Sequence, residues 1–211
     1  MNKVILSEGA DGIVCKGKYL GRDAILKTRF SKSDLDKQIA KERTKSEARS
    51  LIRCLEMRLP VPVLHDADLE NCILTIEYIN ESVTVRNYLD EALNSETFNS
   101  ENILSLAKRI GHTIGRLHEN HIIHGDLTSS NMLITKPYEK SKIILIDFDM
   151  SSEDSRSKPK ADDLYVLEKD IFSTHPNSEG FVESILSEYA KNTNQDSKAV
   201  IQKLDEVRQR G

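Results

Sequence analysis

The chain has no tryptophan, and phenylalanine, tyrosine and tryptophan together make up only 5% of its 211 residues. Cysteine is also scarce: Cys15, Cys54 and Cys72 are odd in number and form no CxxC pair, which argues against a disulfide framework and a thiolate zinc site. No apolar run approaches the roughly 20 residues that cross a bilayer, and the first residues lack the apolar core of a secretory signal. We therefore expect no membrane partner and a reducing location in the cytoplasm and nucleus.

Charge is distributed unevenly along the chain. The net charge is −4, but residues 1–60 hold 14 Lys or Arg against eight Asp or Glu, a balance of +6, and the remainder balances at −10. A basic front end is compatible with a phosphate-rich partner. Basic residues on exposed helix faces are usually just solvated, so charge alone does not decide for nucleic acid.

The first part of the chain has the pattern of a small sheet with one helix. Glycine-bearing turns separate three strand-like segments, 3–7, 12–18 and 23–27. Apolar residues at helical spacing then predict a long helix that Pro60 ends. Two further strands are expected, at 61–64 and 72–79.

From residue 82 onward the apolar period is mostly helical. An apolar stripe over 103–117 predicts a buried helix that leads into a polar loop, 124–131. Two short strands follow, at 132–134 and 142–146. The segment 151–160 is rich in Ser, Lys and acidic residues, and we expect it to be mobile.

The remaining apolar patterns predict helices at 164–171, 181–189 and 199–207. The fold class is therefore α+β, with one small β-rich part and one mainly helical part. We divide the chain into an N-terminal lobe (1–79), a C-terminal lobe (80–205) and a basic tail (206–211).

The strongest chemical signal is the polar loop His124-Gly-Asp-Leu-Thr-Ser-Ser-Asn131, followed after two short strands by Asp147. Phosphoryl transfer needs divalent cations that bridge the phosphates and a group that orients the acceptor. The oxygen atoms of Asn131 and Asp147 suit Mg2+. Asp126 is placed to accept or orient the proton of the attacking hydroxyl or water. A polar loop that caps a helix explains one of these residues, but not the ordered set.

A glycine-bearing turn upstream is the candidate phosphate loop, because small residues let backbone amides approach a triphosphate. Any tight hairpin also uses glycine, so this signal is weak by itself. The candidate residues are Ser7, Glu8, Gly9, Ala10, Asp11, Gly12, Ile13 and Val14.

Lys27 occupies an alternating strand position, and a lysine on a buried face needs an anionic partner. Phosphates together with one carboxylate would supply that partner. We choose Glu47 over Glu42, because the i+4 neighbour of Glu47 belongs to the apolar stripe of the predicted helix. Glu77 and Ile79, at the end of the fifth strand, would offer backbone groups to adenine, although any strand end looks similar.

The order of these motifs resembles the PRPK family, the small atypical kinase subunits of the KEOPS (EKC) complex. The resemblance covers nearly the whole chain and rests on the segments GADGIV, AILK, ERTKSEAR, HGDLTSSN, IDFD, DDLYVLEK, STHPN and KLDEVRQRG. It implies a minimal bilobal eukaryotic-type protein-kinase-like fold, use of ATP and Mg2+, and Ser/Thr autophosphorylation. It also implies ATPase activity in a complex that makes threonylcarbamoyladenosine on tRNA.

Position by position, the resemblance implies that Lys27 holds the phosphates, that Glu47 pairs with it, and that Asp126 is the catalytic acid-base residue. Asn131 and Asp147 would bind metal. The implied partners are a threonylcarbamoyl-transferase (OSGEP-type) subunit, a TPRKB-type small subunit, and tRNA through the complex and the basic tail. Two other functions stay open: a small-molecule phosphotransferase of the aminoglycoside or choline kinase type, and a nucleotide-binding pseudokinase scaffold.

Several residues depart from regulated protein kinases or have two interpretations. The catalytic loop reads His-Gly-Asp without arginine and no Ala-Pro-Glu segment follows, so we expect neither activation by loop phosphorylation nor broad peptide recognition. Asp149 stands where the family has glycine, which suggests backbone strain, an altered metal site or a pseudokinase. Asp162 and Asp163 could cap the next helix or hydrogen-bond the catalytic loop, and we expect one of them to be a cap. Arg208 belongs either to a frayed tail or to a partner contact.

Overall fold

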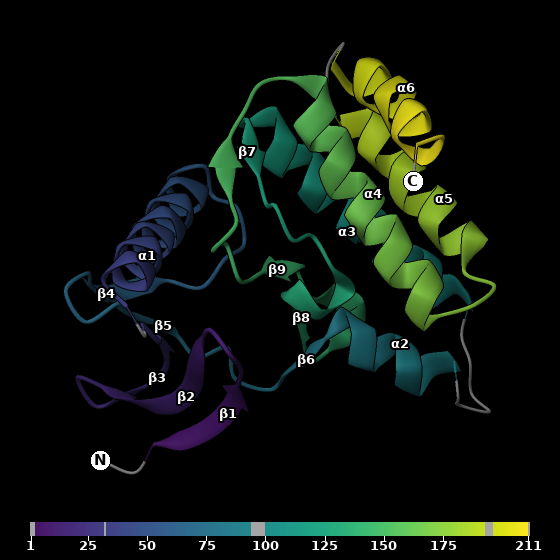
Figure 1. Ribbon diagram of the computed structural model, residues 1–211. Coiled ribbons are helices and arrows are strands. Elements are labelled where there is room, and N and C mark those ends of the chain that lie inside the picture. Colours follow the sequence, from purple (N-terminus) through teal and green to yellow (C-terminus); the bar gives the residue numbers. More distant parts are fainter. Residues whose placement is uncertain (1–2, 32, 94–99, 193–195, 211) are drawn as a thin grey trace. The chain divides into compact units, whose positions relative to one another are not determined.

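The computed structural model describes residues 3–31, 33–93, 100–192 and 196–210 (Figure 1). The chain divides into two compact units. Unit 1 comprises Met1–Asn80 and Phe148–Met150, and unit 2 comprises Glu81–Asp147 and Ser151–Gly211. Unit 1 is a sheet with one helix and unit 2 is mainly helical, so the expected α+β class is confirmed.

Unit 1 contains a five-stranded antiparallel sheet in the order β1-β2-β3-β5-β4. Its strands are β1 (Val4–Glu8), β2 (Gly12–Tyr19), β3 (Arg22–Arg29), β4 (Leu64–Asp68) and β5 (Ile73–Glu77). Gly12 has a steric reason to be glycine, because a Cβ atom there would lie 2.5 Å from the Thr28 carbonyl oxygen of β3. Strands β2 and β3 therefore approach each other closely at the start of β2.

Helix α1 (Asp34–Glu56) follows β3 and begins where the sequence gives it a cap. The Ser33 side chain accepts a hydrogen bond of 3.1 Å from the Asp36 amide, and acidic residues occupy the first turn. The buried face of α1 repeats at helical spacing. It consists of Ala40, Thr44, Glu47, Ala48, Leu51 and Cys54.

One strand of unit 1 lies outside its predicted range. We expected a strand over 61–64, but β4 spans Leu64–Asp68. Pro60 and Pro62 explain the difference, because proline has no N–H to donate to a sheet ladder. The strand begins only after both prolines.

Unit 2 is built from five helices and several short strands in its described part. Its helices are α2 (Val85–Leu93), α3 (Ser100–Glu119), α4 (Ser157–Thr174), α5 (Glu179–Asn192) and α6 (Asp196–Arg208). Its strands are β6 (Ser82–Thr84), β7 (Ile122–Ile123), β8 (Met132–Thr135), β9 (Ile144–Leu145) and β10 (Ser152–Glu153), joined by the 3-10 turns η1 (Ser129–Asn131) and η2 (Tyr138–Lys140). The strands form two small sheets, β6-β8-β9 and β10-β7.

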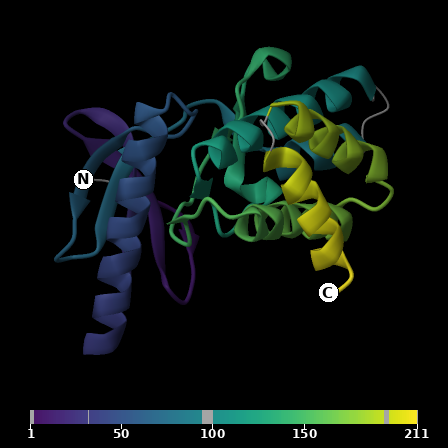
Figure 2. The same cartoon turned by 90° about the horizontal axis from the view of Figure 1, so that it is seen from above.

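The main helix contacts of unit 2 are those of α3 with α5 and of α4 with α6. Gly111 lets α3 and α5 approach closely, because a Cβ atom there would lie 2.3 Å from the Ile185 carbonyl oxygen. Helix α6, drawn in yellow, packs against α4 and α5 (Figure 2). Among the described residues, no helix has both the length and the apolar composition of a membrane span.

The structure corrects two expectations for unit 2 and excludes one of the two alternatives for Arg208. The segment 151–160 is not a mobile linker, because it contains β10 and the first turn of α4, and Lys160 is only 2% exposed. Residues 82–84 form β6 rather than helix, since they pair with β8. Arg208 is not a frayed tail residue: it ends α6, and its Nη2 lies 2.5 Å from the Glu168 carboxylate on α4.

Candidate active site

Lys27 in unit 1 pairs with the carboxylate chosen from the sequence. Its Nζ atom lies 2.7 Å from Glu47 Oε1, and the side chains are 15% and 1% exposed. The alternative, Glu42, is 70% exposed and lies 3.5 Å from Lys45 on the same helix. The predicted pairing of strand β3 with α1 through Glu47 is confirmed. Because Glu47 is buried, removing either partner would cost far more than breaking a surface ion pair.

Arg29 is a second cation at the same carboxylate, and the sequence interpretation missed it. Its Nη2 atom donates to Glu47 Oε2 at 2.5 Å, and its Nη1 donates to Thr44 Oγ1 at 3.2 Å. Arg29 also lies 3.8 Å from Asp149 Oδ2. The sequence could have indicated this contact. Residues two apart on a strand point to the same face, so Arg29 faces α1 as Lys27 does.

The candidate phosphate turn is a tight hairpin in which the Gly9 amide donates to the Gly12 carbonyl oxygen at 2.9 Å. The flanking residues pair across β1 and β2, with Ser7 opposite Val14 and Glu8 opposite Ile13. A side chain at Gly9 would meet nothing within 4 Å, so this glycine leaves the turn open on one side. Gly12 serves the packing of the sheet, whereas a side chain would also fit at Gly9.

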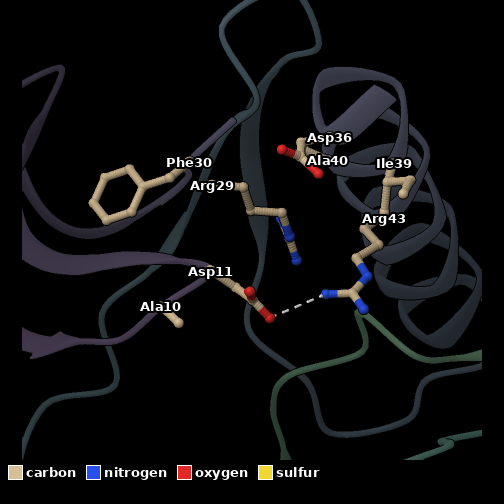
Figure 3. Close-up of a pocket in the computed structure, with 8 residues that line it drawn as sticks. All are labelled: Ala10, Asp11, Arg29, Phe30, Asp36, Ile39, Ala40 and Arg43. Atoms are coloured by element: carbon tan, nitrogen blue, oxygen red, sulfur yellow. Dashed lines mark ion pairs between the residues drawn. The ribbon is translucent and has the colours of Figure 1, made fainter. Parts of the chain in front are cut away.

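A cavity of about 380 Å3 lies between this turn and α1 (Figure 3). Ala10 and Asp11 line it from the turn, and Arg29 and Arg43 extend into it. Arg43 lies 3.5 Å from Asp11, which is 87% exposed, so this ion pair is weak. Only Ala10 and Asp11 of the predicted nucleotide residues line this cavity, which is therefore a side pocket of unit 1 rather than the predicted ATP site.

Glu77 is the last residue of β5, and Ile79, where the predicted strand ended, lies two residues beyond it. The Glu77 amide donates to the Val63 carbonyl at 2.8 Å, and the Glu77 carboxylate accepts from the Val63 amide at 3.1 Å. The carboxylate of Glu77 is thus occupied within unit 1. Any contribution of Glu77 to adenine recognition must come from its backbone.

The catalytic loop of unit 2 brings Asp126 and Asn131 together. Asn131 Nδ2 donates to Asp126 Oδ2 at 3.0 Å and to the Asp126 carbonyl at 2.9 Å. His124 Nε2 lies 3.0 Å from the Ile146 carbonyl, and the Asp126 amide lies 3.4 Å from His124 Nδ1, which assigns the proton to Nε2. The Ile146 amide donates to the Asn131 carbonyl at 3.0 Å. The backbone that precedes Asp147 is therefore tied to the loop from two sides.

Helix α4 holds this loop through Asp163, which is 2% exposed. Its carboxylate accepts from the His124 amide at 2.7 Å, the Gly125 amide at 2.9 Å and His118 Nε2 at 3.2 Å. Of the two roles that the sequence left open for Asp162 and Asp163, the hydrogen bond to the catalytic loop is confirmed for Asp163. Helix capping, which we favoured for one of them, is wrong, because α4 is preceded by Arg156 and has no side-chain cap. Asp162 instead lies 2.7 Å from Lys158.

A second carboxylate of α4, Asp170, was also missed. It accepts from the Ser129 amide at 2.7 Å and from the Ser129 hydroxyl at 2.6 Å, at the first residue of η1. Asp170 lies two helical turns after Asp163, so both face the catalytic loop. Seven-residue spacing of two acidic residues on one predicted helix was the available signal.

Comparison with known proteins decides the family. The chain is 39% identical to the mouse EKC/KEOPS complex subunit Tp53rkb, over 98% of this chain and 86% of the mouse protein. It is 40% identical to the EKC/KEOPS complex subunit bud32 of Dictyostelium discoideum, over 99% of this chain and 82% of that protein. The chain belongs to the PRPK family. The expected resemblance is confirmed.

Other comparisons agree with a PRPK-type kinase fold. The model of the lipopolysaccharide kinase (Kdo/WaaP) family matches residues 13–203. Solved structures of WaaP with acyl carrier protein (TM-score 0.71, 10% identity, 99% of this chain and 88% of that one) and of the Chaetomium thermophilum Rio2 kinase (TM-score 0.60, 14% identity, 97% and 72%) share the fold. This PRPK chain therefore has the predicted kinase-like fold and is a kinase-type protein.

One further relative extends the PRPK comparison. A probable bifunctional tRNA threonylcarbamoyladenosine biosynthesis protein of Methanobrevibacter smithii is 31% identical over 98% of this chain, but this chain spans only 36% of that protein. The PRPK-like part of that protein is thus one portion of a longer polypeptide.

The PRPK site has the donor set that Mg2+ requires. Mg2+ prefers oxygen ligands and is usually held by one or two protein groups plus phosphates. Asp147 and Asn131 supply a carboxylate and an amide oxygen. In the part of the chain that the structure describes, no three His, Cys, Asp or Glu side chains form a closed metal cluster. An open site completed by phosphates fits these residues, whereas a caged structural metal does not.

Asp149 departs from the glycine implied by the PRPK resemblance, but not through backbone strain. Asp149 is absent from the described non-glycine residues with positive φ, whereas Asp147 has a φ of 68°. The expectation of strain at Asp149 is therefore wrong. The unusual backbone belongs to Asp147 itself, and aspartate is among the residues that tolerate this region.

Proposed function

We propose that this chain is an ATP- and Mg2+-dependent atypical kinase and ATPase that works as a KEOPS complex subunit in threonylcarbamoyladenosine modification of tRNA. The observation that carries the proposal is the presence, in one PRPK chain, of a buried Lys27–Glu47 pair and a catalytic loop in which Asn131 holds Asp126. A scaffold that had lost ATP chemistry would have to explain why both arrangements are present together. The names of the relatives supply the complex and the tRNA modification.

Each site residue has a defined task in this proposal. Lys27 binds the phosphates while Glu47 fixes its position, and the turn around Gly9 covers them. The backbone of Glu77 and Ile79 binds adenine. Bound Mg2+, held by Asn131 and Asp147, would neutralise the charge on the phosphates.

Asp126 orients the attacking oxygen and accepts its proton. In hydrolysis, the oxygen of water forms a bond to the γ-phosphorus, and the bond from that phosphorus to the bridging oxygen breaks. ADP leaves with the electron pair of that bond. In autophosphorylation, a Ser or Thr hydroxyl takes the place of water. The Asn131 amide holds the Asp126 carboxylate at 3.0 Å and so fixes the direction from which the acceptor attacks.

The proposed partners are a threonylcarbamoyl-transferase (OSGEP-type) subunit, a TPRKB-type small subunit, and tRNA. Fewer basic residues of the tail are available to partners than the sequence suggested, since Arg208 is bound to Glu168. Arg210 is 72% exposed and lies 3.8 Å from Glu206, so it remains available. We also propose a cytoplasmic and nuclear location, which fits three buried, unpaired cysteines.

The test is Mg2+-dependent ATP hydrolysis by the purified chain, alone and with the transferase subunit and tRNA, together with autophosphorylation followed by mass spectrometry. We expect hydrolysis to rise with the partner and tRNA, and to fall at least about 100-fold in Asp126→Ala and Asp147→Ala. Tight nucleotide binding without turnover under every condition would establish the scaffold instead. Transfer of phosphate to a free amino sugar or choline would establish the small-molecule kinase.

A further inference from the structure

Two cations share one buried carboxylate in unit 1. Glu47 is 1% exposed, and its two oxygens accept separately from Lys27 (2.7 Å) and Arg29 (2.5 Å). A buried carboxylate without a cation is costly. If Lys27 were the only cation, any movement of its ammonium group toward a phosphate would weaken the compensation of Glu47. Arg29 removes this conflict because it remains on Glu47 whatever Lys27 binds.

Arg29 is itself oriented by neighbours. Its side chain is 8% exposed, and its Nη1 donates to Thr44 Oγ1, which in turn donates to the Ala40 carbonyl of α1 at 2.8 Å. A planar guanidinium with several fixed partners loses less freedom than a lysine on each bond it makes. Arg29 is therefore built into unit 1 as a fixed cation beside Lys27.

Asp149 supplies the second negative charge. Its Oδ2 lies 3.8 Å from Arg29 Nη2, and its side chain is 26% exposed. Asp149 thus adds a second carboxylate near Arg29, in addition to Glu47. A glycine at position 149 would remove this ion pair. This gives the departure from glycine a physical reason other than loss of activity.

We propose that Arg29 is a positioning residue that keeps Glu47 in place when Lys27 binds phosphate, and that Asp149 pairs with Arg29. The role of Lys27 as a phosphate ligand rests on the proposed function. The quartet Lys27, Arg29, Glu47 and Asp149 also makes a claim about stability that needs no nucleotide. The two parts are tested by separate measurements.

The nucleotide measurement compares ADP·Mg2+ dissociation constants and the KM and kcat for ATP. Arg29→Met keeps most of the side-chain volume and removes the charge, and we expect it to raise the dissociation constant and KM at least about tenfold. Arg29→Lys should recover affinity to within about threefold of the wild type, because it restores a cation. Arg22→Met is the matched control, since Arg22 is exposed on the same strand, and it should change affinity less than about twofold.

The stability measurement is a double-mutant cycle on Tm without nucleotide. Arg29→Met should lower Tm by about 5–10 °C. Asp149→Asn should lower Tm in the wild-type background, where it removes the negative charge beside Arg29. In the Arg29→Met background the same change should leave Tm unchanged or raise it, because the positive charge of Arg29 is already gone.

The outcomes distinguish the claim about stability from the claim about nucleotide binding. Additive effects of Arg29→Met and Asp149→Asn on Tm overturn the quartet, whether or not the protein binds ATP. An Arg29→Met protein that folds and binds ADP·Mg2+ as tightly as the wild type overturns the positioning role. A wild-type protein that binds no nucleotide overturns both the proposed function and the role of Arg29 toward Lys27, while the Tm cycle still decides the ion-pair quartet.

Discussion

The two units hold their site residues by different physical means. In unit 1, charged side chains hold one another: Glu47 is fixed by Lys27 and Arg29. In unit 2, carboxylates of one helix hold backbone amides: Asp163 and Asp170 of α4 accept from the catalytic loop. Backbone amides at fixed positions leave little freedom, whereas long side chains adjust. The catalytic loop is thus preorganised before substrate arrives, whereas the Lys27–Glu47 pair depends on charged side chains.

Asp163 should be the residue whose removal destabilises the protein most. Asp163→Ala leaves two backbone amides of the loop and the buried His118 without their acceptor. We expect unfolding in urea to show a loss of about 3–4 kcal/mol. Asp162→Ala is the matched control, because that carboxylate makes only an exposed pair with Lys158, and it should cost less than about 0.5 kcal/mol. Equal effects of the two changes would refute the anchoring of the loop by Asp163.

The corresponding change in unit 1 is Glu47→Ala. It leaves Lys27 and Arg29 facing each other without their shared carboxylate, and we expect a loss of about 2–3 kcal/mol in the same unfolding experiment. The control is Glu42→Ala, whose carboxylate is 70% exposed and should contribute almost nothing. A Glu47→Ala protein as stable as the Glu42→Ala protein would show that the ion pairs do not hold unit 1.

Asp170 allows a finer test of the preorganised loop. Asp170→Ala should cost about 1–2 kcal/mol, because it removes the acceptor for the Ser129 amide at the start of η1. Ser129→Ala removes only the hydroxyl bond and should cost about half as much. The order Asp163, Asp170, Ser129 in measured free energies of unfolding would support a loop held mainly through its backbone, and any reversal of the first two would contradict it.

The reactivity of the cysteines reports on unit 1, because all three lie there. Burial raises the pKa of the Cys54 thiol to about 12, so its reactive thiolate is rare at pH 8. We expect iodoacetamide to label Cys54 in the native protein far more slowly than in the unfolded protein, as followed by mass spectrometry. Glu47→Ala should speed labelling by opening unit 1. Rapid native labelling would mean that the inner face of α1 is open to solvent.

The sequence predicted the elements and motifs better than the contacts among them. The long helices, the strands around Lys27 and the pair with Glu47 could be read from periodicity, because burial imposes a period on one element at a time. Arg29 and Asp170 were missed, and Asp163 was left between a helix cap and the catalytic loop, because their partners lie 15 to 45 residues away along the chain. No local pattern records such a contact.

Composition misled the interpretation in two places. The segment 151–160 looked mobile because it is polar, yet Lys160 is buried and lies 3.5 Å from His121. The terminal Arg208 looked like tail, yet it is bound to Glu168. In both cases a polar side chain finds a distant partner, and single-sequence composition has no access to that partner.

Nucleotide use by this site is decided most simply by calorimetric binding of ADP·Mg2+ to the wild type, Lys27→Ala and Asp147→Ala. We predict binding that requires Mg2+, a dissociation constant raised at least about tenfold by Lys27→Ala, and loss of the Mg2+ requirement in Asp147→Ala. Nucleotide binding that neither change affects, or that ignores Mg2+ in the wild type, would contradict an ATP site built on these residues.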